Sequence, residues 1–88
     1  MKTTVRNNSS DDAPPRSPQD GASETSNDIG ATLKAARLRY RLTQQQLADL
    51  AGLSDRTVRD IEKGSTSPSL AAVLAVAETL GVRIEAVV

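Results

Sequence analysis

The chain has 88 residues, and its 11 basic and 11 acidic side chains give a formal net charge of zero. It holds no cysteine and no histidine, which excludes a disulfide framework and a thiolate metal site and removes the usual nucleophile and base of catalysis. A domain this small does not enclose a cleft for other catalytic groups, so we expect no enzyme activity, no cofactor and no metal. No apolar run approaches the length of a membrane span or a signal-peptide core, which predicts a cytoplasmic protein.

The amino-terminal residues differ in composition from the rest of the chain. Residues 1–28 are rich in serine, aspartate, asparagine, proline and threonine, and carry three basic and five acidic groups, a net charge of −2 that leaves +2 on the remainder. Such a segment buries too little apolar surface to offset the entropy of ordering. We therefore predict a disordered tail over residues 1–28, a folded domain over 29–81 and a terminal strand over 82–88. An arm that binds a partner or is cut by proteases is the alternative for the tail.

The first predicted helix begins after Asp28, whose side chain is expected to cap it. Ile29, Leu33 and Arg37 fall four residues apart and share one face of this helix. The pattern continues to Tyr40, so we expect the helix to end there.

The second predicted helix opens with a capping box. Thr43 and Gln46 have the required spacing, in which each side chain binds the backbone N–H of the other residue. The expected apolar face of this helix consists of Leu47, Ala48, Leu50 and Ala51. Gly52 follows where the end of a helix favours a left-handed residue.

Ser54 is expected to cap a third helix over residues 55–63, with Val58 and Ile61 turned inward. Gly64 ends this helix in the same way as Gly52 ends the second.

A fourth helix is predicted from Ser67, as its cap, and Pro68, as its first-turn residue. The positions expected to face the core are Leu70, Val73, Leu74, Ala77 and Leu80. After Gly81 the apolar period changes from 3.6 to 2, which predicts a strand over residues 82–88.

The most informative segment is LTQQQLADLAGLSDRTVRDIEKGSTSPSL. It combines a capped, glutamine-rich helix with Ala48, Gly52, a branched residue at Val58 and the ending Glu62–Gly64. Over Ile29–Leu80 the chain resembles the lambda-repressor-like, XRE-type helix-turn-helix family. The resemblance implies an all-α fold, a small four-helix DNA-binding domain, here with a carboxyl-terminal β-strand. It also implies a transcriptional repressor that binds a palindromic duplex operator as a homodimer.

In this family the third helix lies in the major groove, and its early exposed residues meet base edges. The resemblance therefore assigns base contact to Asp55, Arg56, Thr57, Arg59 and Asp60. Arg56 is the first choice and Arg59 the second, because arginine binds guanine with two hydrogen bonds, while Thr57 suits a thymine methyl. For the two aspartates we favour ion pairs along the helix surface, Asp55 with Arg59 and Asp60 with Arg56, over contact with a cytosine amine.

The resemblance also assigns contacts with DNA phosphates, although each of these residues is individually more typical of a solvated surface. They are Gln44, Ser54, Lys34, Arg39, Arg41 and Lys63. A structural ion pair between Arg37 and Glu62 is implied as well. Removal of either partner would leave a poorly solvated charge.

The terminal strand needs a partner, because a lone strand leaves unpaired backbone groups and an uncovered apolar face. We expect it to pair antiparallel with the same segment of a second subunit about an axis at Ile84, so that Arg83 faces Glu85 of the partner subunit. The residues expected at this contact are Val82, Arg83, Ile84, Glu85, Ala86 and Val88.

This ending is similar to that of the HipB-like antitoxins, which implies an autorepressor with a HipA-like kinase toxin as partner. The alternatives are a stand-alone phage-type or metabolic XRE-family repressor, and a helical protein-interaction module that does not bind DNA. The identity of the adjacent gene, or of a larger protein that co-purifies, would distinguish them.

Overall fold

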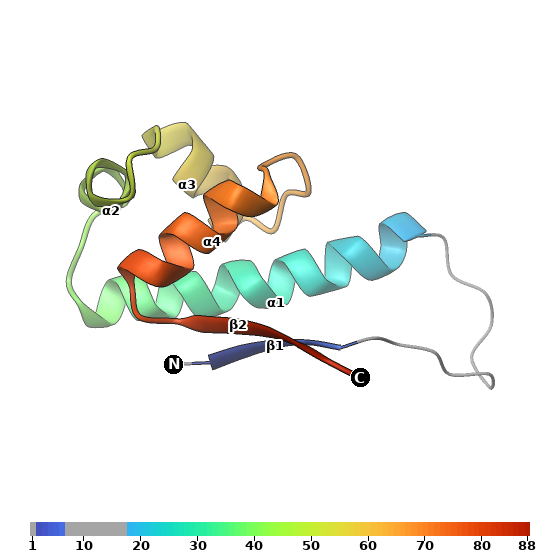
Figure 1. Cartoon of the computed structure of the whole chain (residues 1–88). Coiled ribbons are helices and arrows are strands. Elements are labelled where there is room, and N and C mark those ends of the chain that lie inside the picture. The colour runs from blue at the N-terminus through green and yellow to red at the C-terminus, as the bar shows by residue number, and fades with distance from the viewer. Residues whose placement is uncertain (1, 7–17) are drawn as a thin grey trace.

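A computed structural model of the chain describes residues 2–6 and 18–88, which form four helices and two strands (Figure 1). Their order is β1 (Lys2–Arg6), α1 (Pro18–Arg39), α2 (Gln44–Ala51), α3 (Asp55–Glu62), α4 (Leu70–Thr79) and β2 (Arg83–Val87). The long α1 lies against the other helices on one side and against the strands on the other. The predicted four-helix fold with a carboxyl-terminal strand is therefore confirmed.

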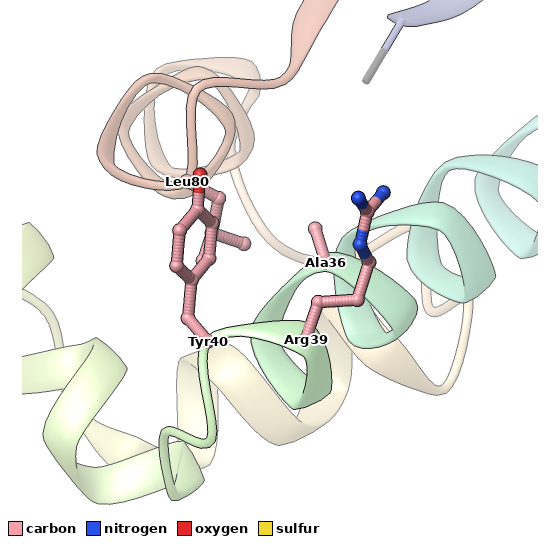
Figure 2. Close-up of a pocket in the computed structure, with 4 residues that line it drawn as sticks. All are labelled: Ala36, Arg39, Tyr40 and Leu80. Atoms are coloured by element: carbon pink, nitrogen blue, oxygen red, sulfur yellow. The ribbon is translucent and has the colours of Figure 1, made fainter.

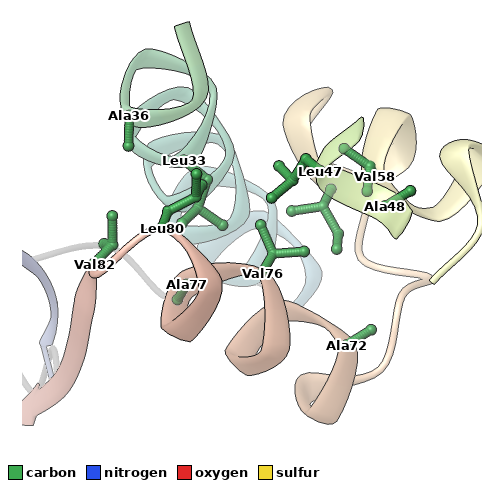
Figure 3. Close-up of a cluster of buried hydrophobic side chains, with 11 residues drawn as sticks. Leu33, Ala36, Leu47, Ala48, Val58, Ala72, Val76, Ala77, Leu80 and Val82 are labelled. Carbon is green, nitrogen blue, oxygen red and sulfur yellow. The ribbon is translucent and has the colours of Figure 1, made fainter. Parts of the chain in front are cut away.

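The core is built from one completely buried, branched side chain of each helix. These are Leu33, Leu47, Val58 and Val76, from α1 to α4 in that order. Smaller buried residues fill the space around them, and Leu80 and Val82 extend the same cluster toward β2 (Figure 3). Because each helix contributes to one core, α2 and α3 are held rigidly against α1 and α4.

α1 begins much earlier than the sequence indicated. It starts at Pro18, so Asp28 lies within the helix and the prediction that it acts as the cap is wrong. Parts of the segment expected to be disordered thus have regular structure, in α1 and in β1, while residues 7–17 of that expected tail lie outside the described residues. An existing helix is extended at little cost once nucleated, and this extension also makes contacts. Ser26, which belongs to the extension, lines a small cleft together with Ile61 and Ser65.

α1 crosses the carboxyl end of α3 at very close range, and Gly30 makes this possible. A Cβ atom at this position would overlap the carbonyl oxygen of Ile61 and lie 3.0 Å from that of Glu62. Any other residue at position 30 would push the two helices apart. No local pattern marks this glycine, because the contact joins residues far apart in the chain.

The ends of α2 and α3 agree with the predicted signals. Thr43 Oγ1 accepts a hydrogen bond from Gln46 N at 3.0 Å, and Gln46 Oε1 accepts one from Thr43 N at 2.8 Å, which completes the capping box. Gly52 and Gly64 have φ angles of 73° and 82°, as expected of left-handed residues at helix ends. On α2, however, Leu50 is exposed although it was expected on the apolar face.

α4 differs from the prediction in its cap and in the face that it buries. The cap is Ser69, whose Oγ accepts a hydrogen bond from Ala72 N at 3.1 Å, while Ser67 bonds with Ser65 in the preceding loop. Leu70 and Leu74 are exposed instead of buried. The residues that face the core are Ala72, Val73, Val76, Ala77 and Leu80. Every residue from 70 to 77 is apolar, so periodicity alone could not select the inward face.

The terminal strand pairs within the chain. β2 is confirmed over Arg83–Val87, and β1 lies beside it in parallel, with Lys2 opposite Arg83 and Arg6 opposite Val87. Two features differ from the expected dimer contact. Val82 is buried in the chain's own core, and Arg83 Nε lies 3.3 Å from Glu85 Oε2 of the same chain.

Candidate nucleic-acid interface

α2 and α3 pack through small and branched side chains on either side of a short turn. Ala48 of α2 and Val58 of α3 are buried, and the turn passes through the left-handed Gly52. Leu53 N then donates to the Ala48 carbonyl oxygen at 2.9 Å, which closes the end of α2. A short helix, a glycine turn and a second helix with a polar outer face constitute the helix-turn-helix arrangement.

α3 presents its polar residues to solvent. Asp55, Arg56 and Arg59 are exposed, and Thr57 and Asp60 are half-buried. The structure thus places all five expected base-contacting residues on one short helix whose other side, with Val58 and Ile61, is buried.

Of the two ion pairs expected along α3, one is present among the described residues and the other is not. Arg59 Nη2 lies 3.8 Å from Asp55 Oδ2, and both side chains are about half exposed. Arg56 makes no ion pair with Asp60 within the described part of the chain. An exposed pair such as Asp55–Arg59 contributes little stability and is readily exchanged for another partner. Arg56 is therefore the arginine on α3 whose guanidinium is available without breaking an ion pair.

The amino-terminal cap of α3 involves two residues that were predicted to contact DNA, Ser54 and Thr57. Ser54 Oγ accepts a hydrogen bond from Thr57 N at 3.1 Å and lies 2.9 Å from Thr57 Oγ1. These bonds fix the first turn of α3 and hold the Thr57 side chain in one orientation. Its methyl group is then the part of Thr57 that does not take part in the cap.

The structure contains the expected ion pair between Arg37 and Glu62, which joins α1 to α3 and also involves the turn after α1. Arg37 Nε donates to Glu62 Oε2 at 2.7 Å and Nη2 donates to Oε1 at 3.0 Å, with both side chains nearly inaccessible. Arg37 Nη1 also donates to the Leu42 carbonyl oxygen at 2.7 Å. Because its hydrogen bonds are satisfied, this buried pair holds the end of α1 against the end of α3.

Gln44 belongs to the same network, which sequence reasoning did not indicate. Its Nε2 donates to Glu62 Oε1 at 3.1 Å. A carboxylate only accepts hydrogen bonds, so the orientation of the Gln44 amide is determined. One amide N–H is used by Glu62, and the second N–H at the start of α2 remains for another acceptor.

The four cations expected to contact phosphate are all exposed and come from different parts of the fold. Lys34 is on α1, Arg41 in the α1–α2 turn and Lys63 at the end of α3. Arg39 also lines a pocket of about 210 Å³ with Ala36, Tyr40 and Leu80 (Figure 2). The other residues that line this pocket come from the end of α1, the position after it and the end of α4, and none of the described lining residues belongs to α3.

Comparison with known proteins agrees with this geometry. A helix-turn-helix family model matches residues 33–87, and the chain belongs to this helix-turn-helix family. The resemblance inferred from the sequence is thereby confirmed at the level of the family. Among the described residues, no helix is both long and apolar enough to cross a membrane.

Several relatives share this region. The chain is 43% identical over 60 residues to the immunity repressor protein of Bacillus phage phi105, of which it covers 42%. It is 37% identical over 62 residues to an uncharacterised HTH-type transcriptional regulator of Sinorhizobium fredii, of which it covers 82%. It also matches a type II methyltransferase of Lactococcus lactis, at 46% identity, but over only 12% of that enzyme. The chain thus spans less than half of the phage repressor and a small part of the methyltransferase.

Proposed function

We propose that the chain is a DNA-binding transcriptional repressor that binds duplex DNA as a homodimer with α3 in the major groove. The observation that supports this most directly is the two-sided character of α3. Val58 and Ile61 anchor the helix in the core, while Arg56, Arg59 and Thr57 lie on its accessible side. A rigidly held helix with exposed bidentate donors matches the requirements of base readout.

Arg56 is the principal base-reading residue in this proposal. Its side chain is exposed and enters no ion pair within the described residues, so binding guanine breaks no existing interaction. Arg59 is second, because it must first leave Asp55. Asp55 acts mainly through that pair, and Asp60 and Thr57 supply lesser contacts at the edge of the helix.

Phosphate contacts flank the recognition helix in this proposal. Gln44 retains a second amide N–H beside the one that binds Glu62, and it stands at the start of α2, where free backbone N–H groups also favour an anion. Arg41, Lys63 and Lys34 supply exposed positive charge, with Ser54 at the cap of α3. Arg39 is the weakest member of the expected set, given its place beside α4.

A homodimer doubles the number of DNA contacts that a single copy of the chain can make. The net charge of residues 29–88 is only +2, so tight binding requires two recognition helices and two sets of phosphate contacts. Pairing of β2 with its symmetric copy, with Ile84, Ala86 and Val88 at the contact, is the route we propose. The operator is then an inverted repeat with half-sites about 34–36 Å apart.

A narrower proposal concerns the branch of the family. The strand that directly follows α4 favours an antitoxin of the HipB-like type, with a kinase toxin as partner. The identity with a phage immunity repressor favours a stand-alone repressor. Co-expression with the product of the neighbouring gene, followed by purification on a tagged chain, decides between them. A stoichiometric complex supports the antitoxin, and its absence supports the stand-alone repressor.

The central test is selection of bound fragments from a random duplex library, followed by measurements on Arg56→Ala. We expect an inverted repeat, and we expect Arg56→Ala to weaken its binding by about 1–3 kcal/mol and to relax the preference at one base pair per half-site. Lys63→Ala is the matched control, since loss of a phosphate contact weakens binding to all sequences alike. Failure to enrich any sequence would refute the proposal and favour a protein-interaction module.

A further inference from the structure

The strand β2 has one edge covered and one edge open. β1 pairs along one side of it in parallel, and the sheet formed by the described residues contains these two strands alone. A two-stranded sheet is marginally stable in water, and an open strand edge invites pairing with another chain. A single chain therefore forms a sheet that can accept a further strand along the open edge of β2.

The sequence of one strand suits the inside of a larger sheet, and that of the other suits an edge. The segment from Val82 to Val88 reads VRIEAVV, with apolar residues at five of seven positions, whereas Lys2–Arg6 reads KTTVR. Interior strands are apolar, and edge strands are protected from further pairing by polar and basic residues. β2 has the sequence of an inner strand and β1 that of an outer one.

We propose that the dimer contains a four-stranded sheet in the order β1–β2–β2–β1, in which the two copies of β2 pair antiparallel at the centre and each β1 protects an outer edge. This rests on the homodimer of the proposed function. The occupant of the open edge is a second copy of the chain, because antiparallel pairing about Ile84 sets each Arg83 opposite Glu85 of the partner subunit. Each of these side chains is already close to its own-chain partner, at 3.3 Å, so the four charges form one alternating cluster.

The position of the sheet supports this arrangement. β1 contacts α1, and β2 contacts α4, and the pair of strands runs along α1 on the side away from α2 and α3 (Figure 1). β1 is thus placed on the far side of β2 from the open edge, where it does not obstruct a second subunit. The amino-terminal strand becomes a structural part of the dimer, and not a tail that can be lost without effect.

The test removes β1 and measures dimerisation. We would compare the full chain with a deletion of residues 2–6 and with the double substitution Thr3→Pro and Thr4→Pro. Successive amides of a strand point to opposite edges, so one of these prolines must remove a hydrogen bond to β2. The double substitution Thr3→Val and Thr4→Val is the control, since valine retains the preference for a strand.

The dimer dissociation constant is measured by sedimentation equilibrium, with circular dichroism to verify that the helices are intact. We expect the deletion and the double-proline variant to weaken the dimer by about tenfold or more, and the valine control to leave it unchanged. An unchanged constant in all variants would overturn the four-stranded sheet while leaving the proposed dimeric repressor in place. A tighter dimer on deletion would show that β1 and the second subunit compete for one edge. A full-length chain that is monomeric and fails to bind duplex DNA would reject both proposals together.

Discussion

At the scale of single residues, Arg41 is notable for its backbone conformation. Its φ of 57° makes it the one non-glycine residue with a positive φ within the described residues. It closes α1 together with its neighbour: Arg41 N donates to the Leu38 carbonyl oxygen at 3.0 Å, and Leu42 N to that of Arg37 at 3.2 Å. Glycine is the residue usually found at such a position, because a side chain there is strained. A role of the Arg41 charge in binding DNA would explain why an arginine occupies this strained position.

We predict opposite effects of Arg41→Gly on stability and on DNA affinity. The substitution should raise the free energy of unfolding by about 1 kcal/mol, because it relieves the left-handed strain. It should weaken DNA binding and reduce its dependence on salt, because a phosphate contact is lost. Thermal denaturation and titrations at several salt concentrations measure both effects, with Arg41→Lys as the control that retains the charge and the strain. Equal DNA affinity for the glycine variant would exclude Arg41 from the interface.

At the scale of secondary-structure elements, α4 shows why an apolar helix is hard to orient from sequence. Its segment LAAVLAVA has apolar residues all round, so the inward face is chosen by the shape of the surface formed by the other helices. Small and branched residues, Ala72 and Val76, face that surface, and the longer Leu70 and Leu74 do not. Short side chains at the inward positions allow the other helices to pack closely against α4.

This orientation predicts unequal effects for two leucines on the same helix segment. Leu80 is 3% exposed and Leu74 is 42% exposed. Leu80→Ala should therefore lower the free energy of unfolding by about 2–5 kcal/mol, through lost burial and a cavity. Leu74→Ala should change it by no more than about 0.5 kcal/mol. Urea denaturation of the two variants distinguishes the observed face from the predicted one, under which both would be destabilising.

At the scale of the whole molecule, the sheet connects the two ends of the chain and sets the geometry of the proposed dimer. Pairing about Ile84 places this residue on the twofold axis, next to its own copy. The chain contains no cysteine, so a single introduced thiol can report on this arrangement without interference.

We predict that Ile84→Cys forms a disulfide between two chains under mild oxidation, because Cβ atoms directly opposite in an antiparallel pair lie about 4.5–5.5 Å apart, close to disulfide geometry. Val87→Cys is the matched control. In the same register it faces residue 81 of the partner subunit, so the two thiols are too far apart to join. Electrophoresis without reductant measures the cross-linked fraction. Cross-linking of both variants to the same extent would exclude an axis at Ile84.

The sequence by itself determined the features that depend on neighbours along the chain. The capping box of Thr43 and Gln46, the left-handed glycines at 52 and 64 and the cap at Ser54 are all local, and each depends on bonds or torsions within a few residues. The strand after Gly81 was predicted from a local alternation of apolar residues, although its partner strand was not. The inward residues of α3 were also predicted correctly, because charged side chains surround Val58 and Ile61 and leave one possible face. The ion pair of Arg37 and Glu62 came from resemblance to the family, since 25 positions separate these residues.

Only the tertiary structure decided the features that join distant segments. The early residues of α1 lie near the region after α3, with Ser26 beside Ser65 and Asn27 beside Gly64, and no local pattern reveals this proximity. The face of α4, the bond from Gln44 to Glu62 and the pairing of β1 with β2 likewise depend on which surfaces meet after the chain folds. Local torsions and hydrogen bonds are encoded within a window of a few residues, whereas packing is a property of the whole chain, so the second set required the structure.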